Sequence, residues 1–419
     1  MRVYFSCIVG FVCLCAPMEA QSEQPPQFDL HDGDRIVFVG DTLIERDQRY
    51  GYLETLLTIS NPDKNLIFRN LGWSGDTVGG ISRSGFDRPE AGFEQLRHQI
   101  LAVKPTVVVV GYGMADSFAG EAGLPAFEQG LSRLLYVIDS TKARVAFLSP
   151  VAHANLGRPL PDPTGHNRDL VRYRDVIKRV AKLRSANFVE LFDVFDSFYS
   201  SLPAGQTGGY RLLTDDGIHL TKDGYWNADL LISVLLGQDH GTIARELVLD
   251  KRGEIVGQEG ARASEVERTA VGVRFKMVDN FLPMPEQSSM LQPSLGRRRL
   301  RVRELPPGRY HLKIDGAIVA TASSEGWNEG VTLKSGPEFD QVEALRVAIN
   351  HKNELFFYRW RPQNITYLLG FRKHEQGNNA VEIPQFDPLV AEQETTIARL
   401  KKPVAHVYEL SRVEKEVGR

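Results

Sequence analysis

Residues 35–43 read Arg-Ile-Val-Phe-Val-Gly-Asp-Thr-Leu, and the first half of the chain is organised around this stretch. The apolar run 36–39 has the composition of a buried strand, and helical spacing begins soon after Gly40 and Asp41. A strand that ends in a tight turn and feeds a helix exposes one side chain at the carboxyl edge of a sheet, where the helix N-terminus favours negative charge. The stretch therefore predicts a nucleophile turn, with Thr42 at the position where a serine is expected.

Strand-like and helix-like segments alternate from this turn to about Gly237. Repeated alternation implies a parallel sheet covered by helices on both faces, so we predict an α/β fold whose ligand lies outside the carboxyl ends of the strands. The expected strands are 36–39, 66–71, 106–110, 145–148 and 188–192, and the expected helices are 43–59, 93–103, 125–138, 167–183 and 222–236.

The pattern changes in the second half of the chain. Segments 265–279 and 300–321 alternate apolar and polar residues and contain turn signals, so we expect antiparallel strands there. Helices are expected at 339–350 and 391–400. The resulting division is a signal peptide at 1–20, a linker at 21–33, an α/β domain at 34–240 and a C-terminal β-rich accessory region with terminal helices at 241–419.

Composition is that of an ordinary globular protein, with 42% hydrophobic and 25% charged residues among 419. The net charge of −3 gives no basic footprint for nucleic acid, so no nucleic-acid partner is expected. No apolar run after the N-terminal segment is long enough for a membrane helix, and the sequence leaves the oligomeric state open.

The N-terminus has the features of an export signal: Arg2, an apolar run at 3–16, and the small residue Ala20. The alternative is an N-terminal anchor, although the run is short for a membrane span. The cysteines all lie in this segment, so the mature chain is expected to have no disulfide; they are Cys7, Cys13 and Cys15. Export without disulfides predicts a periplasmic or extracellular protein.

Four motifs fall at expected strand ends, at 40–43, 70–76, 111–117 and 216–220. Hydrolysis of an acyl bond needs a nucleophile, a base, a group that orients the base, and donors for the oxyanion. Thr42 offers a hydroxyl, His219 is the natural base, and Asp216 reaches the other imidazole nitrogen within one turn. The backbone N–H groups of Thr42 and Gly72 are the expected oxyanion donors. Each motif alone is weak, because Asp-x-x-His is common and glycines also mark turns, but their order along one parallel sheet is informative.

In this order the motifs resemble the blocks of the SGNH (GDSL) hydrolase superfamily, which contains esterases and acylhydrolases. The resemblance covers roughly residues 35–237, and the matching positions are Gly40, Asp41, Leu43, Gly72, Asp216 and His219. It implies a flavodoxin-like three-layer sandwich with a parallel sheet, an oxyanion hole that includes Gly72 N–H, and the base and orienter named above. The longer strings at 70–76, 111–123, 361–364 and 371–379 are similar to a planctomycete-type branch of exported proteins in this superfamily.

Two departures from the superfamily pattern affect catalysis. The γ-methyl of Thr42 restricts χ1 and crowds the acyl carbon. Ala115 stands where the family has an asparagine, and loss of one oxyanion donor costs on the order of 10²–10³ in rate. Three interpretations stay open: Thr42 is a slow or specialised nucleophile, His219 activates water or another hydroxyl such as that of Ser74, or the cleft binds a ligand without turnover. Ser74 is also explained as a turn-capping residue.

The second half offers one polar and aromatic cluster, Arg359-Trp360-Arg361 with Asn364. Arg361 and Asn364 either line a ligand site or belong to an interdomain interface, because Trp and Arg are common in both. The C-terminal strands are either a carbohydrate-binding module or a structural addition. No cluster has zinc-ligand spacing, so we expect no metal and no cofactor. The leading hypothesis is an exported hydrolase that cleaves an acyl ester of a carbohydrate or lipid with Thr42, His219 and Asp216. Its rival is a catalytically inactive protein of the same fold that serves as a binding module.

Overall fold

The structure is a computed structural model of the chain, and the residues that it describes are 28–85, 87–202, 209, 212–238, 246–249, 255–269, 271–285, 290, 298–362 and 372–413. The expected signal peptide, most of the expected linker, and Asn364 lie outside these ranges. Within them, no helix is both long enough and apolar enough to cross a bilayer.

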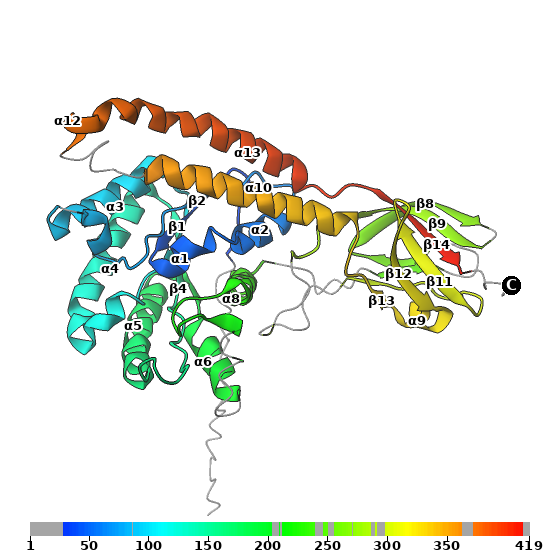
Figure 1. The fold of residues 1–419 in the computed structure, drawn as a ribbon, viewed down its shortest axis with the longest axis horizontal. Coiled ribbons are helices and arrows are strands. Elements are labelled where there is room, and N and C mark those ends of the chain that lie inside the picture. Colours follow the sequence, from blue (N-terminus) through cyan, green and yellow to red (C-terminus); the bar gives the residue numbers. More distant parts are fainter. Residues whose placement is uncertain are drawn as a thin grey trace, which may run out of the picture.

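The first half of the chain is a five-stranded parallel sheet with helices on both faces (Figure 1). The strand order is β2-β1-β3-β4-β5. The strands are β1 (Arg35–Gly40), β2 (Ile67–Asn70), β3 (Val107–Gly111), β4 (Arg144–Leu148) and β5 (Asn187–Val189). The helices are α1 (Thr42–Asp47), α2 (Tyr52–Ile59), α3 (Pro89–Val103), α4 (Leu124–Thr141), α5 (Thr164–Leu183), α6 (Phe192–Ser201) and α8 (Lys222–Leu235). The predicted flavodoxin-like α/β sandwich is confirmed.

Strand β1 shows why its sequence is a continuous apolar run. Ile36 and Phe38 are buried on one face of the sheet, whereas Val37 and Val39 are buried on the other. The strand ends at Gly40, where an added Cβ would lie 2.3 Å from the carbonyl oxygen of Gly111 on β3. Only glycine allows this approach, which places the nucleophile turn tightly against the edge of the sheet.

Two local predictions were wrong in this half. The expected helix 43–59 is two helices, α1 and α2, because Gly51 between them has a left-handed φ of 65°. The expected strand 188–192 is shorter, and the unpredicted helix α6 begins at Phe192. That helix buries Phe192, Phe195 and Tyr199 on one face, a spacing that does indicate a helix.

The second half contains a five-stranded antiparallel sheet with the order β12-β11-β14-β9-β8. Its core includes Phe275, Leu312 and Tyr408. The elements of this half are β6 (Glu246–Leu249), β7 (Ile255–Glu259), β8 (Ala261–Thr269), β9 (Gly272–Asp279), β10 (Arg299–Leu300), β11 (Arg309–Ile314), β12 (Ala317–Ser323), α9 (Ser324–Glu329), β13 (Val331–Thr332), α10 (Pro337–Trp360), α12 (Lys373–Gln376), α13 (Phe386–Leu400) and β14 (His406–Arg412). The last strand, β14, lies in the middle of the sheet, so the end of the chain completes this unit.

Helices α10 and α13 pack side by side and extend from the β-rich unit across the α/β unit; we call them the helical arm (Figure 1). Helix α10 buries Val342, Leu345 and Ile349 in the same core as α2 and α8. It is longer than the expected 339–350 because Phe356, in the aromatic stretch, continues its buried face. The arm therefore carries residues of the second half into the α/β unit.

Candidate active site

The predicted nucleophile turn is formed by the end of β1 and the start of α1. Asp41 caps α1: its carboxylate accepts a hydrogen bond of 3.1 Å from the N–H of Leu43, and Thr42 is the first helical residue. Burial raises the pKa of Asp41 to about 7, although backbone N–H donors oppose the shift. The sequence thus places the Thr42 hydroxyl at the carboxyl edge of the sheet, as predicted.

His219 and Asp216 form a direct pair. Asp216 Oδ2 lies 2.6 Å from His219 Nδ1, and Oδ1 accepts from the backbone N–H groups of Ile218 at 3.0 Å and His219 at 2.8 Å. Burial would raise the pKa of Asp216, but these hydrogen bonds outweigh it and hold the pKa below its ordinary value. An ionised Asp216 keeps the proton of His219 on Nδ1, which leaves Nε2 as a free base.

A chain of three polar side chains lies beside the turn that carries Asp216 and His219. The Oγ of Ser117 is 2.7 Å from His166 Nε2, and the Nδ1 atoms of His166 and His153 are 3.0 Å apart. Burial lowers the pKa of His153 and brings that of His166 to about 4, so both are neutral at neutral pH. The backbone N–H of Ala154, next to His153, donates to Gly217 O at 2.9 Å, so this segment supports the turn that carries His219.

Thr42 and His219 line the same pocket. Its other walls are mostly apolar and include Leu43, Met114, Val151, Ile218 and Leu220, and its volume is about 20 Å³. Among the described residues, no hydrogen bond joins Thr42 to His219. Hydrogen bonds between a nucleophile and its base often form only when substrate is bound.

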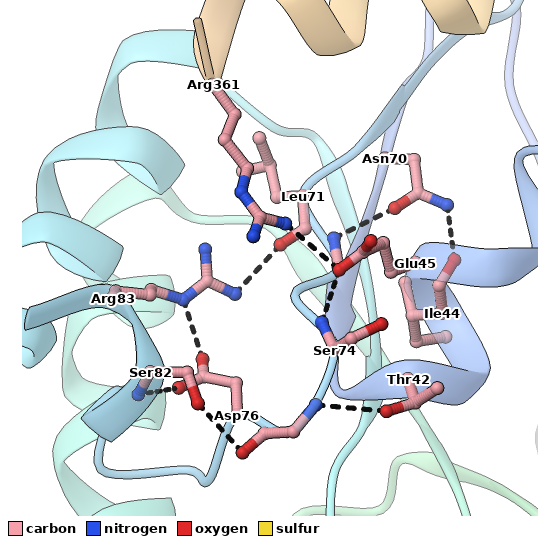
Figure 2. Close-up of polar contacts among 12 residues, drawn as sticks. Thr42, Ile44, Glu45, Asn70, Leu71, Ser74, Asp76, Ser82, Arg83 and Arg361 are labelled. Carbon is pink, nitrogen blue, oxygen red and sulfur yellow. Dashed lines mark hydrogen bonds and ion pairs between the residues drawn. The ribbon is translucent and has the colours of Figure 1, made fainter. Parts of the chain in front are cut away.

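The Thr42 hydroxyl does have a partner, which the sequence did not predict. Its Oγ1 accepts a hydrogen bond of 3.0 Å from the backbone N–H of Gly75 (Figure 2). Gly75 has a left-handed φ of 69°, and the N–H of Asp76 donates to Trp73 O at 3.0 Å, so residues 73–76 form a tight turn. The string Ser74-Gly75-Asp76 is typical of a turn, but nothing in the sequence indicates that this turn contacts Thr42.

Gly72, the second predicted oxyanion donor, has a local partner. Its N–H donates to Asn70 Oδ1 at 2.8 Å (Figure 2). An added Cβ at Gly72 would lie 2.3 Å from the backbone nitrogen of Glu45 on α1, so glycine is required for close packing there. The other predicted donor, Thr42 N–H, lies in the first turn of α1 and has no acceptor among the described residues.

Two further candidate site residues are Ser74, which lies in this turn, and Arg361, which lies beside it. Arg361 Nη1 is 3.0 Å from Glu45 Oε2, and its guanidinium carbon is 3.5 Å from the centre of the Trp73 ring. Ser74 N–H donates to the same oxygen of Glu45 (Figure 2). Arg361 therefore joins the helical arm to the α/β unit, as the interface interpretation expects. Ala115 stands at the start of a short 3-10 helix at Asp116–Ala119 and offers no side-chain donor.

A buried ion pair fixes the far side of the turn. Arg83 Nε lies 2.7 Å from Asp76 Oδ2, and both side chains are fully buried. Burial raises the pKa of Asp76, against the effect of Arg83. Because breaking such a pair leaves an uncompensated buried charge, Asp76, at the far end of the turn, is held against Arg83.

Comparisons with known proteins agree with this fold. Residues 33–226 match the model of the GDSL-like Lipase/Acylhydrolase family. A search of curated proteins found no match. Among solved structures, a gut microbial diltiazem-metabolizing enzyme is 16% identical, with a TM-score of 0.73 over 92% of this chain and 99% of that chain. An acetylxylan esterase from Geobacillus stearothermophilus is 17% identical, with a TM-score of 0.39 over 49% of this chain and 95% of that chain.

The family match covers the sheet and the turns that carry Thr42, Gly72, Asp216 and His219. Because the first of these solved structures is only 16% identical, its likeness to this chain concerns the fold alone. That likeness extends to the second half of the chain. Residues 33–226 of the chain are therefore similar to the GDSL-like Lipase/Acylhydrolase family.

Proposed function

We propose that this protein is an exported esterase that removes a short acyl group from a carbohydrate or lipid alcohol, with Thr42 as nucleophile. The observation that carries the proposal is that Thr42 and His219 line one small pocket, with Asp216 paired to His219 Nδ1. His219 Nε2 accepts the proton of the Thr42 hydroxyl while Oγ1 bonds to the acyl carbon, and the carbonyl electron pair moves onto oxygen. Collapse of this intermediate expels the alcohol, which takes the proton from His219. Water then repeats the sequence and frees Thr42.

The pocket supports a short acyl group. Its volume of about 20 Å³ is little more than the 10–15 Å³ that one water needs, and Leu43, Met114 and Ile218 give it apolar walls. An acetyl methyl fits such a space, whereas a longer chain requires the walls to move. The γ-methyl of Thr42 and the lack of a side-chain donor at Ala115 point to slow turnover.

The test is hydrolysis of p-nitrophenyl acetate and butyrate by the wild type, Thr42→Ala and Thr42→Ser. We expect the wild type to favour acetate by at least about tenfold, because each misfitting methylene costs about 1–3 kcal/mol. Thr42→Ala is expected to lower kcat by about 10² or more, and Thr42→Ser to retain or raise it. A wild type no faster than Thr42→Ala, with a gain only in Thr42→Ser, would show that the natural chain is a binding module.

A further inference from the structure

The end of α10 reaches the turn that holds the Thr42 hydroxyl. Arg361 caps α10 and is half-buried, and its guanidinium stacks on the Trp73 ring at 3.5 Å. It also pairs with Glu45 on α1 at 3.0 Å. A planar guanidinium that stacks and pairs at once is held in one orientation, so Arg361 is a fixed point between the helical arm and α1.

Helix α1 presents Thr42 and Glu45 on one face, because they are three residues apart. Each binds one of two successive backbone N–H groups of the opposite turn (Figure 2). Glu45 Oε2 accepts from Ser74 N–H, and Thr42 Oγ1 accepts from Gly75 N–H at 3.0 Å. The position of Gly75 N–H on the Thr42 hydroxyl therefore depends on the preceding contact, between Ser74 N–H and Glu45 Oε2. Arg361 pairs with that same oxygen of Glu45.

The Gly75 hydrogen bond has a chemical consequence for the nucleophile. It occupies a lone pair of Thr42 Oγ1 and selects one rotamer, so the hydroxyl proton remains available to a base such as His219. It also fixes the position from which Oγ1 forms its bond to the acyl carbon. A displacement of this N–H by about 1 Å is enough to lower the rate about 10²-fold.

We propose that Arg361 is a positioning residue of the acyl-transfer site. By holding Glu45 against Ser74 N–H, it fixes Gly75 N–H on the Thr42 oxygen, so the helical arm is a required part of the active site. This inference rests on the proposed esterase function, and it adds a role for the second half of the chain in catalysis.

The test compares Arg361→Gln, Arg361→Lys and Glu45→Gln with the matched control Arg359→Gln. Arg359 lies on the same helix and pairs at 2.9 Å with Asp387 of α13, so its loss loosens the arm and leaves the turn contact intact. Two quantities are measured in the full-length protein: kcat and KM for p-nitrophenyl acetate, and hydrogen exchange of the Gly75 amide.

We expect Arg361→Gln to lower kcat about 10- to 100-fold with KM within about twofold, and to accelerate Gly75 exchange. Arg361→Lys should recover part of kcat and part of the protection of the Gly75 amide. The losses in kcat of Arg361→Gln and Glu45→Gln should not add in the double variant, because the two residues act through one contact. Arg359→Gln should match the wild type in both quantities.

The inference is overturned if Arg361→Gln matches the wild type, or if Arg359→Gln lowers kcat equally. A wild type without esterase activity would remove the proposed function, and Gly75 exchange alone would then decide the role of Arg361. Unchanged exchange in Arg361→Gln would reject that role, and faster exchange in this variant alone would support it.

Discussion

Replacing His219 by alanine will lower kcat/KM for p-nitrophenyl acetate by about 10²–10⁴, which is the contribution of a positioned general base. The side chain is 30% exposed and its Nδ1 pairs with Asp216 at 2.6 Å, so its loss removes the base with little effect on packing. The thermal midpoint should therefore remain close to that of the wild type, and steady-state kinetics with a melting curve measure both.

Asp216→Asn is the companion variant. An asparagine keeps an oxygen for the N–H groups of Ile218 and His219 but loses the charge that holds the His219 proton on Nδ1. We expect a large loss of kcat here too, with the turn intact. Retention of activity in both variants would mean that the Asp216–His219 pair has no part in the reaction.

Replacing Lys352 by alanine will lower the free energy of unfolding by about 3–5 kcal/mol, which is the cost of breaking a buried ion pair. Lys352 Nζ, on α10, lies 2.6 and 2.8 Å from the two carboxylate oxygens of Glu54 on α2, and both side chains are buried. Its removal leaves Glu54 charged and buried, with the amide of Asn353 at 3.1 Å as a remaining donor. Urea unfolding measures the change.

The matched control is Lys276→Ala. Lys276 also pairs with a glutamate at 2.8 Å, Glu265, but both side chains are largely exposed. Exposed pairs contribute about 0–1 kcal/mol, so this variant should unfold almost as the wild type does. Equal losses in Lys352→Ala and Lys276→Ala would contradict the view that the helical arm is fixed to the α/β unit through a buried charge.

Much of the α/β half could be predicted from the sequence, because the residues that determine its elements lie close together along the chain. The apolar run of β1, the glycine at its end and the short spacing from Asp216 to His219 each act within a few residues. Other features depend on distant partners. The extension of α10 to Trp360 depends on packing against the sheet unit, and the central place of β14 depends on strands far away in sequence.

The candidate site divides in the same way. The sequence predicted the turn of Thr42 and the pairing of His219 with Asp216, both of which are local. It did not predict Gly75 as the partner of the Thr42 hydroxyl, because that contact joins two separate turns. Nor did it predict a role for Glu45. Its spacing on α1 places it beside Thr42, but its partners are Ser74, in the turn at 73–76, and Arg361, at the end of α10.

The most direct test of the central claim, that Thr42 is a working nucleophile, is covalent labelling. The full-length protein is treated with a small alkyl fluorophosphonate, which phosphonylates an activated hydroxyl, and the modified peptide is identified by mass spectrometry. The account predicts a single adduct on Thr42 that is absent from Thr42→Ala and strongly reduced in His219→Ala. An adduct on Ser74, or an unmodified wild type under conditions that label Thr42→Ser, would contradict it.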